Sequence, residues 1–461
     1  MTIHATQTAG SASVLADLRQ VFASGRTRAL EWRLEQLRGI QRFVDERETE
    51  IAAALAEDLG RTPVEAWLGD VASTKGEAVY ALKHLKKWMR RRRESLPLAQ
   101  LPGRAWVQYD PLGVVLIIGP WNYPLYLSLA PLVAAVAAGN CAVIKPSELA
   151  PATSALLAQW VPQYVDPEAI RVIEGDAAAT QELLAAGFDH AFFTGGTEVG
   201  KKIMAAAAPT LTPVTLELGG KSPVIVAADA DIDVTARRIA WVKLLNSGQT
   251  CIAPDYLLAD RRIADELIGK IVANIRDFRA GEGDPALPIV NQRQFDRLVS
   301  LISTTDGKVV AGGGSDASAL RIEPTVIVDP SPCDPVMTDE IFGPLLPVLP
   351  AESLDYAVDF VNSRPKPLAL YVFASTQLGR DLVDRMPSGG AVINHVAMHC
   401  LVPQLPFGGV GASGMGAYHG KWGFETLSHR RAVLSKPAKP DPRLVYPPYS
   451  QRTLSIMRRL F

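Results

Sequence analysis

Residues 113–145 have the sequence GVVLIIGPWNYPLYLSLAPLVAAVAAGNCAVIK and decide the fold class. An unbroken apolar strand, Val114 to Ile118, is followed by a helix rich in alanine and leucine, Pro124 to Ala138, and by a second apolar strand, Ala142 to Ile144. Strands without polar alternation are typical of a parallel sheet that helices cover on both faces. The stretch therefore predicts one β-α-β unit of an α/β domain.

Residues 111–144 carry no Asp, Glu, Lys, Arg or His, and a run of this length could span a bilayer. Prolines and glycines divide the run into shorter pieces, at Gly113, Gly119, Pro120, Pro124, Pro131 and Gly139. We therefore interpret it as buried elements of a globular domain, and we expect no membrane anchor.

The alternation of strands and helices continues on both sides of this unit. Upstream, helical periodicity covers residues 14–58 and Val71–Trp88, and Ala105–Tyr109 is predicted to be an edge strand. Downstream, the pattern predicts helices at Pro151–Trp160, Gln181–Ala186 and Gly200–Ala208, and strands at Ile170–Ile173 and His190–Phe193. A second β/α series runs from Val214 to Asn394, and residues 403–423 are predicted to be an ordered loop. Such repetition is typical of a doubly wound, Rossmann-like fold, which binds nucleotides at the carboxyl ends of its strands.

The composition argues against several classes of function. A chain of 461 residues is long enough for about two to three domains. Its formal net charge of −1 produces no field that would attract nucleic acid or an anionic membrane. Four separated cysteines, without a CxxC pair or an HExxH motif, indicate neither a disulfide framework nor a metal site. Because Met1–Ser13 shows no secretory signal, we expect a cytoplasmic protein.

The strongest sign of chemistry is Cys251, in the turn Asn246-Ser247-Gly248-Gln249-Thr250-Cys251-Ile252-Ala253-Pro254. A structural cysteine usually has apolar neighbours, whereas this one follows a glycine, an amide and hydroxyl groups. A free thiol with a pKa of about 8.5 is only slightly ionised near neutral pH. Backbone N–H groups at a polar turn are one way to raise the thiolate fraction and to bind an oxyanion. The turn alone leaves a catalytic and a buried structural cysteine as alternatives.

Two strand ends carry polar side chains that would complete such a site. Glu217 lies in the apolar strand Val214–Leu218, where a buried carboxylate is costly unless it acts, for example as a general base. The alternative is a salt bridge between Glu217 and Lys221. Asn122 follows the strand Val114–Ile118 and could donate its side-chain amide to an oxyanion.

Two loops suggest where a nucleotide binds. Lys145 and Glu148 follow a buried strand and could bind ribose hydroxyls, although a surface turn would have the same sequence. Gly195–Lys202 lies between a strand and a helix and nearly matches a Walker A loop, but Lys202 replaces the Ser/Thr that binds Mg²⁺. We interpret this loop as a pyrophosphate site at a helix N-terminus.

Two other motifs are less specific. Gly409–Gly414 matches GxGxxG, but no apolar strand leads into it, so it is predicted to be a glycine-rich loop. Asp339–Pro344 holds a carboxylate, Glu340, and an aromatic ring, Phe342, which suit a ribose contact and a stacking wall. Any acidic turn would look similar.

Six segments, in the same order along the chain, resemble the aldehyde dehydrogenase superfamily, and the resemblance covers nearly the whole sequence. They are Pro120–Pro124, Ile144–Glu148, Phe193–Gly195, Leu216–Pro223, Gly248–Cys251 and Glu340–Pro344. Three further segments are similar to its class 3 branch, which acts on aromatic (coniferyl aldehyde-like) and medium- to long-chain fatty aldehydes: Cys251–Tyr256, Pro367–Phe373 and Leu405–Gly411.

The resemblance implies a role for each candidate residue. Cys251 would attack the aldehyde, Asn122 and the Cys251 backbone N–H would bind the oxyanion, and Glu217 would activate the water that hydrolyses the thioester. NAD, with NADP as the alternative, would accept the hydride. The implied cofactor contacts are Trp121, Lys145, Glu148, Gly195, Gly200, Leu218, Gly219, Glu340 and Phe342.

The resemblance also implies an NAD(P)-binding domain at 1–88 and 111–217, a catalytic domain at 218–394, and an oligomerisation extension at 89–110 and 395–461 that forms a homodimer. The basic run Arg90–Arg93 is expected to be a solvated or partner-contacting helix end. Two other functions remain as alternatives: acyl transfer to coenzyme A, against which Glu217 argues, and a P-loop-like nucleotide-binding protein.

Overall fold

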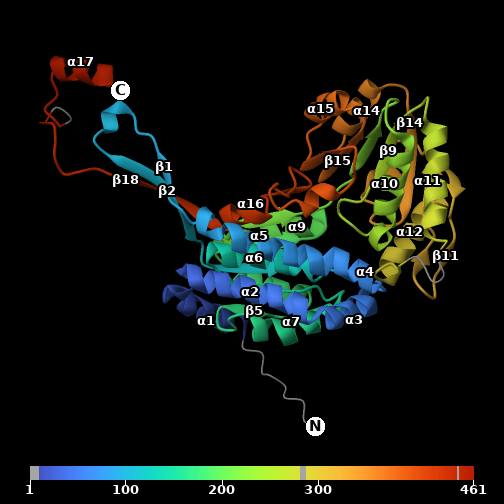
Figure 1. Cartoon of the computed structure of the whole chain (residues 1–461), viewed down its shortest axis with the longest axis horizontal. Helices are drawn as coiled ribbons and strands as arrows, with labels where there is room; N and C mark the ends of the chain where they lie inside the picture. Colours follow the sequence, from blue (N-terminus) through green and yellow to red (C-terminus); the bar gives the residue numbers. More distant parts are fainter. Residues whose placement is uncertain (1–9, 281–286, 444–445, 461) are drawn as a thin grey trace, which may run out of the picture.

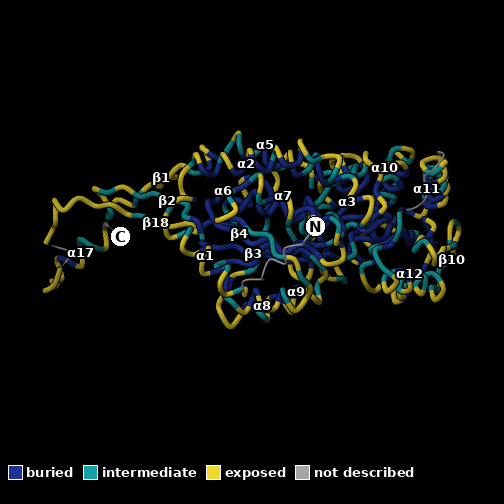
Figure 2. Tube along the Cα trace, turned by 90° about the horizontal axis from the view of Figure 1, so that it is seen from below, coloured by how far each residue is buried: buried dark blue, intermediate teal, exposed yellow. Residues whose placement is uncertain are grey.

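Two mostly parallel sheets, each with helices packed on it, form the two halves of the body, and a small antiparallel sheet projects from it as an arm (Figure 1). This computed structural model describes residues 10–280, 287–443 and 446–460. Buried residues concentrate in the sheets and in the helix faces that pack on them, whereas the arm is largely exposed (Figure 2).

The first sheet has the strand order β17-β7-β6-β3-β4-β5, and all its pairings are parallel except that of β17. Its strands are β3 (Val114–Ile118), β4 (Cys141–Lys145), β5 (Ile170–Val172), β6 (His190–Thr194), β7 (Val214–Glu217) and β17 (Gly414–Met415). Every residue of β3 and β4 is buried, as their apolar sequences predict, and the burial extends to Lys145, which ends β4. The strand order reverses beside β3, which makes this the switch point at which doubly wound sheets bind nucleotides.

Helices lie on both sides of this sheet, α8 and α9 on one and α2, α5 and α6 on the other (Figure 2). The helices of this half are α1 (Ser11–Ala23), α2 (Leu30–Glu46), α3 (Glu48–Leu59), α4 (Pro63–Ala66), the π-helical turn η2 (Trp67–Val71), α5 (Ala72–Trp88), α6 (Tyr126–Ala138), α7 (Pro151–Tyr164), α8 (Ala177–Ala186) and α9 (Thr197–Ala207), with 3₁₀ turns η1 (Arg26–Arg28) and η4 (Ala208–Thr210). The helix predicted at Pro124–Ala138 is confirmed as α6, which begins two residues later.

The charge-free run 111–144 forms β3, α6 and β4, each packed in the core. Among the described residues, no helix is both long and apolar enough to cross a bilayer.

The second sheet has the order β10-β13-β14-β9-β8-β15-β16, and only β10 is antiparallel to its neighbour. Its strands are β8 (Pro223–Val226), β9 (Tyr256–Asp260), β10 (Lys308–Ala311), β13 (Thr325–Val328), β14 (Leu345–Ala351), β15 (Ala369–Phe373) and β16 (Gly390–Ile393). The elements around it are α10 (Ile232–Leu244), η5 (Leu245–Gly248), α11 (Ala264–Phe278), α12 (Gln292–Thr304), α13 (Pro335–Thr338), α14 (Leu354–Asn362) and α15 (Thr376–Arg385), with the small hairpin β11 (Ser315–Asp316) and β12 (Arg321–Ile322). The chain passes from the first sheet to the second between β7 and β8, directly after Glu217.

The arm is a three-stranded antiparallel sheet in the order β1-β2-β18 (Figure 1). Its strands are β1 (Arg92–Glu94), β2 (Arg104–Pro111) and β18 (Ser428–Ser435), and the 3₁₀ turn η3 (Leu98–Gln100) lies between β1 and β2. The prediction of Ala105–Tyr109 as an edge strand was wrong, because β18 returns from the far end of the chain and makes β2 the central strand. The basic run is not only a helix end either: α5 stops at Trp88, and Arg92 and Arg93 belong to β1.

The last segments of the chain are the 3₁₀ turn η6 (Met398–Leu401), α16 (Gly420–Thr426) and α17 (Gln451–Leu460). Residues 403–423 were predicted to be a loop, and the prediction is wrong at two places. Gly414 and Met415 pair with β7 as β17, and α16 begins at Gly420.

Candidate active site

The turn that carries Cys251 is strained and buried. Asn246, Ser247 and Gly248 follow α10 in the left-handed region, with φ of 51°, 50° and 72°. Such a conformation is unfavourable for the two residues that are not glycine, and it persists only where the surroundings hold it. Gly248 allows a close approach, because a Cβ there would lie 2.2 Å from the carbonyl oxygen of Gly343.

Side-chain amides connect this turn to the end of β3. The Asn122 Nδ2 atom donates to the carbonyl oxygen of Gln249 over 3.1 Å, and Asn246 Nδ2 donates to the same oxygen over 3.0 Å. Asn246 Nδ2 also donates to the Asn122 carbonyl oxygen over 3.1 Å. The structure therefore places the predicted oxyanion donor directly against the turn that carries Cys251.

The Cys251 thiol is held in its protonated form by its surroundings. Burial raises its pKa, and the carboxyl groups of Glu340 and Glu217 raise it further. The polar turn alone does not favour the thiolate, because desolvation outweighs the neighbouring dipoles. A proton acceptor is therefore needed before Cys251 can act as a nucleophile.

Glu217 is a carboxyl group without a partner. It ends β7, is 3 % exposed, and neither of its oxygens has a hydrogen-bond partner among the described residues. Burial raises its pKa well above the usual range. The alternative of a salt bridge to Lys221 is excluded here, because Lys221 Nζ lies 2.7 Å from Asp255 Oδ1. An unpaired buried carboxyl with a raised pKa is a common property of catalytic acids and bases.

A second carboxyl group, that of Glu340, lies directly against Gly219. A Cβ at Gly219 would be 2.0 Å from Glu340 Oε2, so only glycine fits there. Burial and the charge of Asp255 raise the pKa of Glu340 to about 8. Beside it, the Phe342 ring stands edge-on to that of Trp121, with centroids 5.4 Å apart.

The remaining predicted cofactor residues lie at the carboxyl ends of β4, β6 and β7. Lys145 is buried, and its Nζ donates to Glu148 Oε2 over 3.0 Å and to the Gly175 carbonyl oxygen over 2.7 Å. Gly200 at the first turn of α9 touches Leu218, since a Cβ there would be 2.6 Å from the Leu218 side chain. Gly195 is similarly closed in by an aromatic ring. These residues fit a dinucleotide, because they line one edge of a doubly wound sheet and leave backbone close to the site.

The two motif matches have different outcomes. Lys201, in the Walker-like loop, forms an exposed ion pair with Glu198 in the first turn of α9. Residues 409–413 form a loop, as predicted, whereas Gly414 begins β17. The loop packs on the site: the Ser413 carbonyl oxygen accepts the Leu218 N–H over 3.2 Å.

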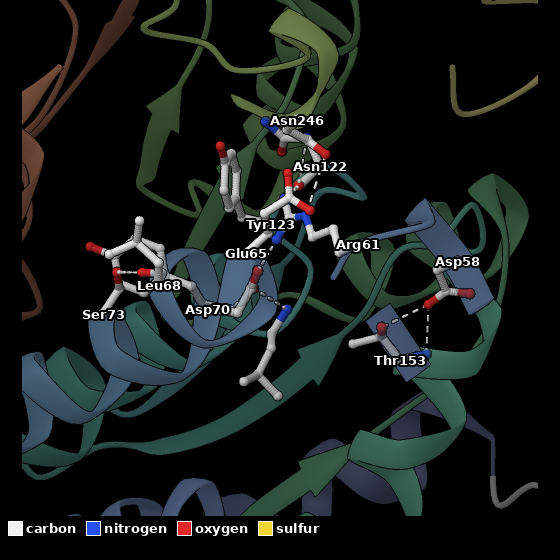
Figure 3. A network of polar contacts seen from close by, with 12 residues as sticks. Asp58, Arg61, Glu65, Leu68, Asp70, Ser73, Asn122, Tyr123, Thr153 and Asn246 are labelled. Carbon is white, nitrogen blue, oxygen red and sulfur yellow. Dashed lines mark hydrogen bonds and ion pairs between the residues drawn. The ribbon is translucent and has the colours of Figure 1, made fainter. Parts of the chain in front are cut away.

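Sequence patterns missed three buried charges that support the site. Arg61 and Asp70 form an ion pair behind Asn122 (Figure 3). Lys243 on α10 donates to the Pro254 carbonyl oxygen over 2.9 Å and closes the turn after Cys251, and burial lowers its pKa to about 8. Lys243 lies in an ordinary helical pattern, and Arg61 and Asp70 lie between two predicted helices, so only their burial, which the sequence does not show, distinguishes these residues.

Comparison with known proteins agrees with this geometry. The profile of the aldehyde dehydrogenase family matches residues 1–433. Aldehyde dehydrogenase family 3 member A2 of Mus musculus is 47% identical over 445 residues, which are 95% of this chain and 91% of the relative. The dimeric NADP-preferring aldehyde dehydrogenase of Rattus norvegicus is 46% identical over 91% of this chain and 93% of its own. The substrate-bound structure of AldH from Staphylococcus aureus superimposes with a TM-score of 0.93, at 39% identity, over 97% of this chain and 99% of that chain.

Proposed function

The chain belongs to the aldehyde dehydrogenase family, and on that basis we propose that it oxidises an aldehyde to the carboxylic acid with NAD(P) by nucleophilic catalysis at Cys251. One observation carries the assignment of residues. The Asn122 amide lies on the Cys251 turn, and the unpaired Glu217 carboxyl is near enough to raise the pKa of the Cys251 thiol. A nucleophile, an oxyanion donor and a base are the three parts that acyl chemistry needs.

In the proposed mechanism, the Cys251 thiol loses its proton to solvent, and the sulfur attacks the carbonyl carbon. The Asn122 Nδ2 group and the Cys251 backbone N–H donate to the oxygen as it becomes negative. Bound NAD(P)⁺ supplies the acceptor for the hydride, which leaves the acyl group on sulfur as a thioester. Glu217, in its ionised form, takes a proton from a water molecule that attacks this thioester, and it returns this proton to the departing Cys251 sulfur. The carboxylic acid departs and Cys251 regains its proton.

The remaining contacts support a cofactor that lies along the edge of the first sheet. We assign Lys145 and Glu148 to the adenosine ribose, Gly195 and Gly200 to the pyrophosphate, and Glu340 with Phe342 to the nicotinamide half. Trp121, Leu218 and Gly219 complete the wall of this proposed cofactor site. We propose NAD as the preferred cofactor, because the Glu148 carboxylate would repel a 2′-phosphate.

Replacing Glu148 by alanine is expected to raise the ratio of kcat/KM for NADP to that for NAD about tenfold, the effect of ~1.4 kcal/mol. The ratio is measured with one aldehyde and both cofactors. Glu168→Ala is the matched control, since it removes an exposed carboxylate of the same half that pairs with Arg26 instead. An unchanged ratio in Glu148→Ala would place the ribose elsewhere.

The substrate class follows from the resemblance to the class 3 branch: aromatic or medium- to long-chain aliphatic aldehydes. The function is tested by product analysis. With benzaldehyde or a long-chain aldehyde and NAD, we expect one carboxylic acid for each NADH, at the same rate with and without coenzyme A. Formation of acyl-coenzyme A, or turnover that requires coenzyme A, would favour the acyl-transfer alternative.

We propose a division into the cofactor domain (1–88 and 111–217), the catalytic domain (218–394) and the dimerisation extension (89–110 and 395–461). The course of the chain from the first sheet to the second after Glu217 supports the first boundary. Exposed leucines on the arm, Leu98, Leu101 and Leu434, support a homodimer built on this extension. Four free cysteines, Cys141, Cys251, Cys333 and Cys400, support a cytoplasmic location.

A further inference from the structure

We propose that Arg61 and Asp70 are positioning residues that hold the Asn122 amide and the Cys251 turn in the arrangement that binds the oxyanion. This inference rests on the proposed function, and it assigns part of the transition-state stabilisation to an ion pair that touches neither substrate nor cofactor. The two side chains come from the segment between α3 and α5 and reach the end of β3 (Figure 3).

Asp70 fixes the chain directly after Asn122. Its side chain is fully buried, and Oδ1 accepts the backbone N–H groups of Leu125 and Tyr126 over 3.1 and 2.8 Å. These groups lie at the start of α6, so the carboxylate takes the place of a helix cap. Its other oxygen, Oδ2, accepts from Arg61 Nη1. Asp70 lies in the π-helical turn η2, and such turns occur frequently at functional sites.

Arg61 continues the connection from Asp70 to the Cys251 turn. Its Nη2 donates to the Asn122 carbonyl oxygen, which also accepts from Asn246 Nδ2 over 3.1 Å. Its Nε lies 3.4 Å from Asn246 Oδ1, at the limit of a hydrogen bond. Two donors on one carbonyl oxygen fix the plane of the 122–123 peptide and hence the direction of the Asn122 side chain.

The Arg61 guanidinium group also contacts the aromatic ring of the residue that follows Asn122. It lies 4.3 Å from the centroid of the Tyr123 ring, and the Tyr123 hydroxyl is 2.9 Å from Thr250 Oγ1. Arg61 therefore touches the residues on both sides of the 122–123 peptide bond and, through Tyr123 and Asn246, two places in the turn before Cys251.

A stability role alone does not explain this arrangement well. A buried ion pair frequently contributes no more to stability than apolar residues of the same size, because both charges must be desolvated. The fork of an arginine does give directional hydrogen bonds that a lysine cannot reproduce. Among the described residues, the hydrogen bonds of the Arg61 fork all go to Asp70, Asn122 or Asn246. The geometry is therefore that of a support for the oxyanion donor.

The test is a double-mutant cycle between Arg61→Lys and Asn122→Ala, with Asp70→Asn as a second, nearly isosteric variant. In the wild-type background, each positioning variant is expected to lower kcat about 10- to 100-fold, less than the ~10²–10³-fold for outright loss of an oxyanion donor. KM for the cofactor should change less than about twofold. In the Asn122→Ala background, the same changes should lower kcat by less than about twofold, because the group they position is gone.

Arg33→Lys is the matched control. Arg33 is another buried arginine, and its Nη1 donates to the Ala137 carbonyl oxygen over 2.9 Å at the opposite end of α6. This variant should lower the thermal midpoint and leave kcat within about twofold. All rates are measured well below each variant's midpoint, so that loss of folded protein does not enter kcat.

An equal loss of kcat in both Asn122 backgrounds, or no loss in the wild-type background for either variant, would overturn the inference and leave Arg61 and Asp70 as structural residues. Failure of the proposed function looks different: Asn122→Ala alone would then keep full kcat. If Arg61→Lys does not fold, Asp70→Asn completes the same cycle and decides the question.

Discussion

Replacing Cys251 by alanine is expected to abolish aldehyde-dependent reduction of NAD, with kcat falling by about 10⁴-fold or more, as for other enzymes that lose their nucleophile. We expect no other cysteine to substitute, because the Asn122 amide lies against the turn that carries Cys251. The fold should tolerate the change, since alanine removes one sulfur atom from a partly exposed position. Initial rates of NADH formation with benzaldehyde provide the measurement.

The control for this prediction is Cys333→Ala, which removes an exposed thiol. It should retain full activity, and both variants should bind NAD with wild-type affinity in a calorimetric titration. Retention of even a tenth of the wild-type rate by Cys251→Ala would mean that the nucleophile has been misassigned.

Replacing Glu217 by glutamine is expected to lower steady-state turnover by about 10²- to 10⁴-fold, the usual effect of losing a general base. Thioester hydrolysis then becomes limiting, and wild-type kcat should rise with pH as Glu217 ionises. The direction follows from its raised pKa: burial keeps the carboxyl protonated to higher pH, and only the ionised form is a base. Glu217→Gln should lose this pH dependence.

The measurement is kcat as a function of pH, in parallel with Glu198→Gln, which changes an exposed carboxyl group on α9. Glu198→Gln should follow the wild-type profile. Full turnover by Glu217→Gln without coenzyme A would show that another group activates the water.

The fold could be predicted where one periodicity dominates the sequence. Residues 113–145 specify β3, α6 and β4 because buried parallel strands and a buried helix need apolar residues at every position. β14 was missed although it is central in the second sheet, because Pro347 and Pro350 interrupt Leu345–Ala351 and proline is rare in central strands. β18 was missed because its pairing with β2 joins residues more than 300 positions apart and its surface is exposed and basic.

The candidate site, like the fold, could be predicted where the signal is local in the sequence and could not be predicted where it depends on distant residues. Cys251, Glu217 and Asn122 could each be named from a strand end or a turn. Their proximity in the fold could not be predicted, since the hydrogen bond from Asn122 to Gln249 joins positions 127 residues apart. The direction of the thiol pKa shift could not be predicted from the sequence, because the neighbouring residues are polar while the fold supplies burial. Arg61 and Asp70 are inconspicuous until the structure shows that Arg61 donates to the Asn122 carbonyl oxygen and that Asp70 accepts from the start of α6.

The central claim is that Cys251 carries the acyl group and Glu217 releases it. The most direct test is to mix Glu217→Gln with NAD and benzaldehyde, quench, digest and identify the modified peptide by mass spectrometry. We predict one benzoyl thioester for each active site, on the peptide that contains Cys251, together with an equal amount of NADH formed in a single burst. Absence of an adduct despite NADH formation, or an adduct on Cys400 instead, would contradict the account.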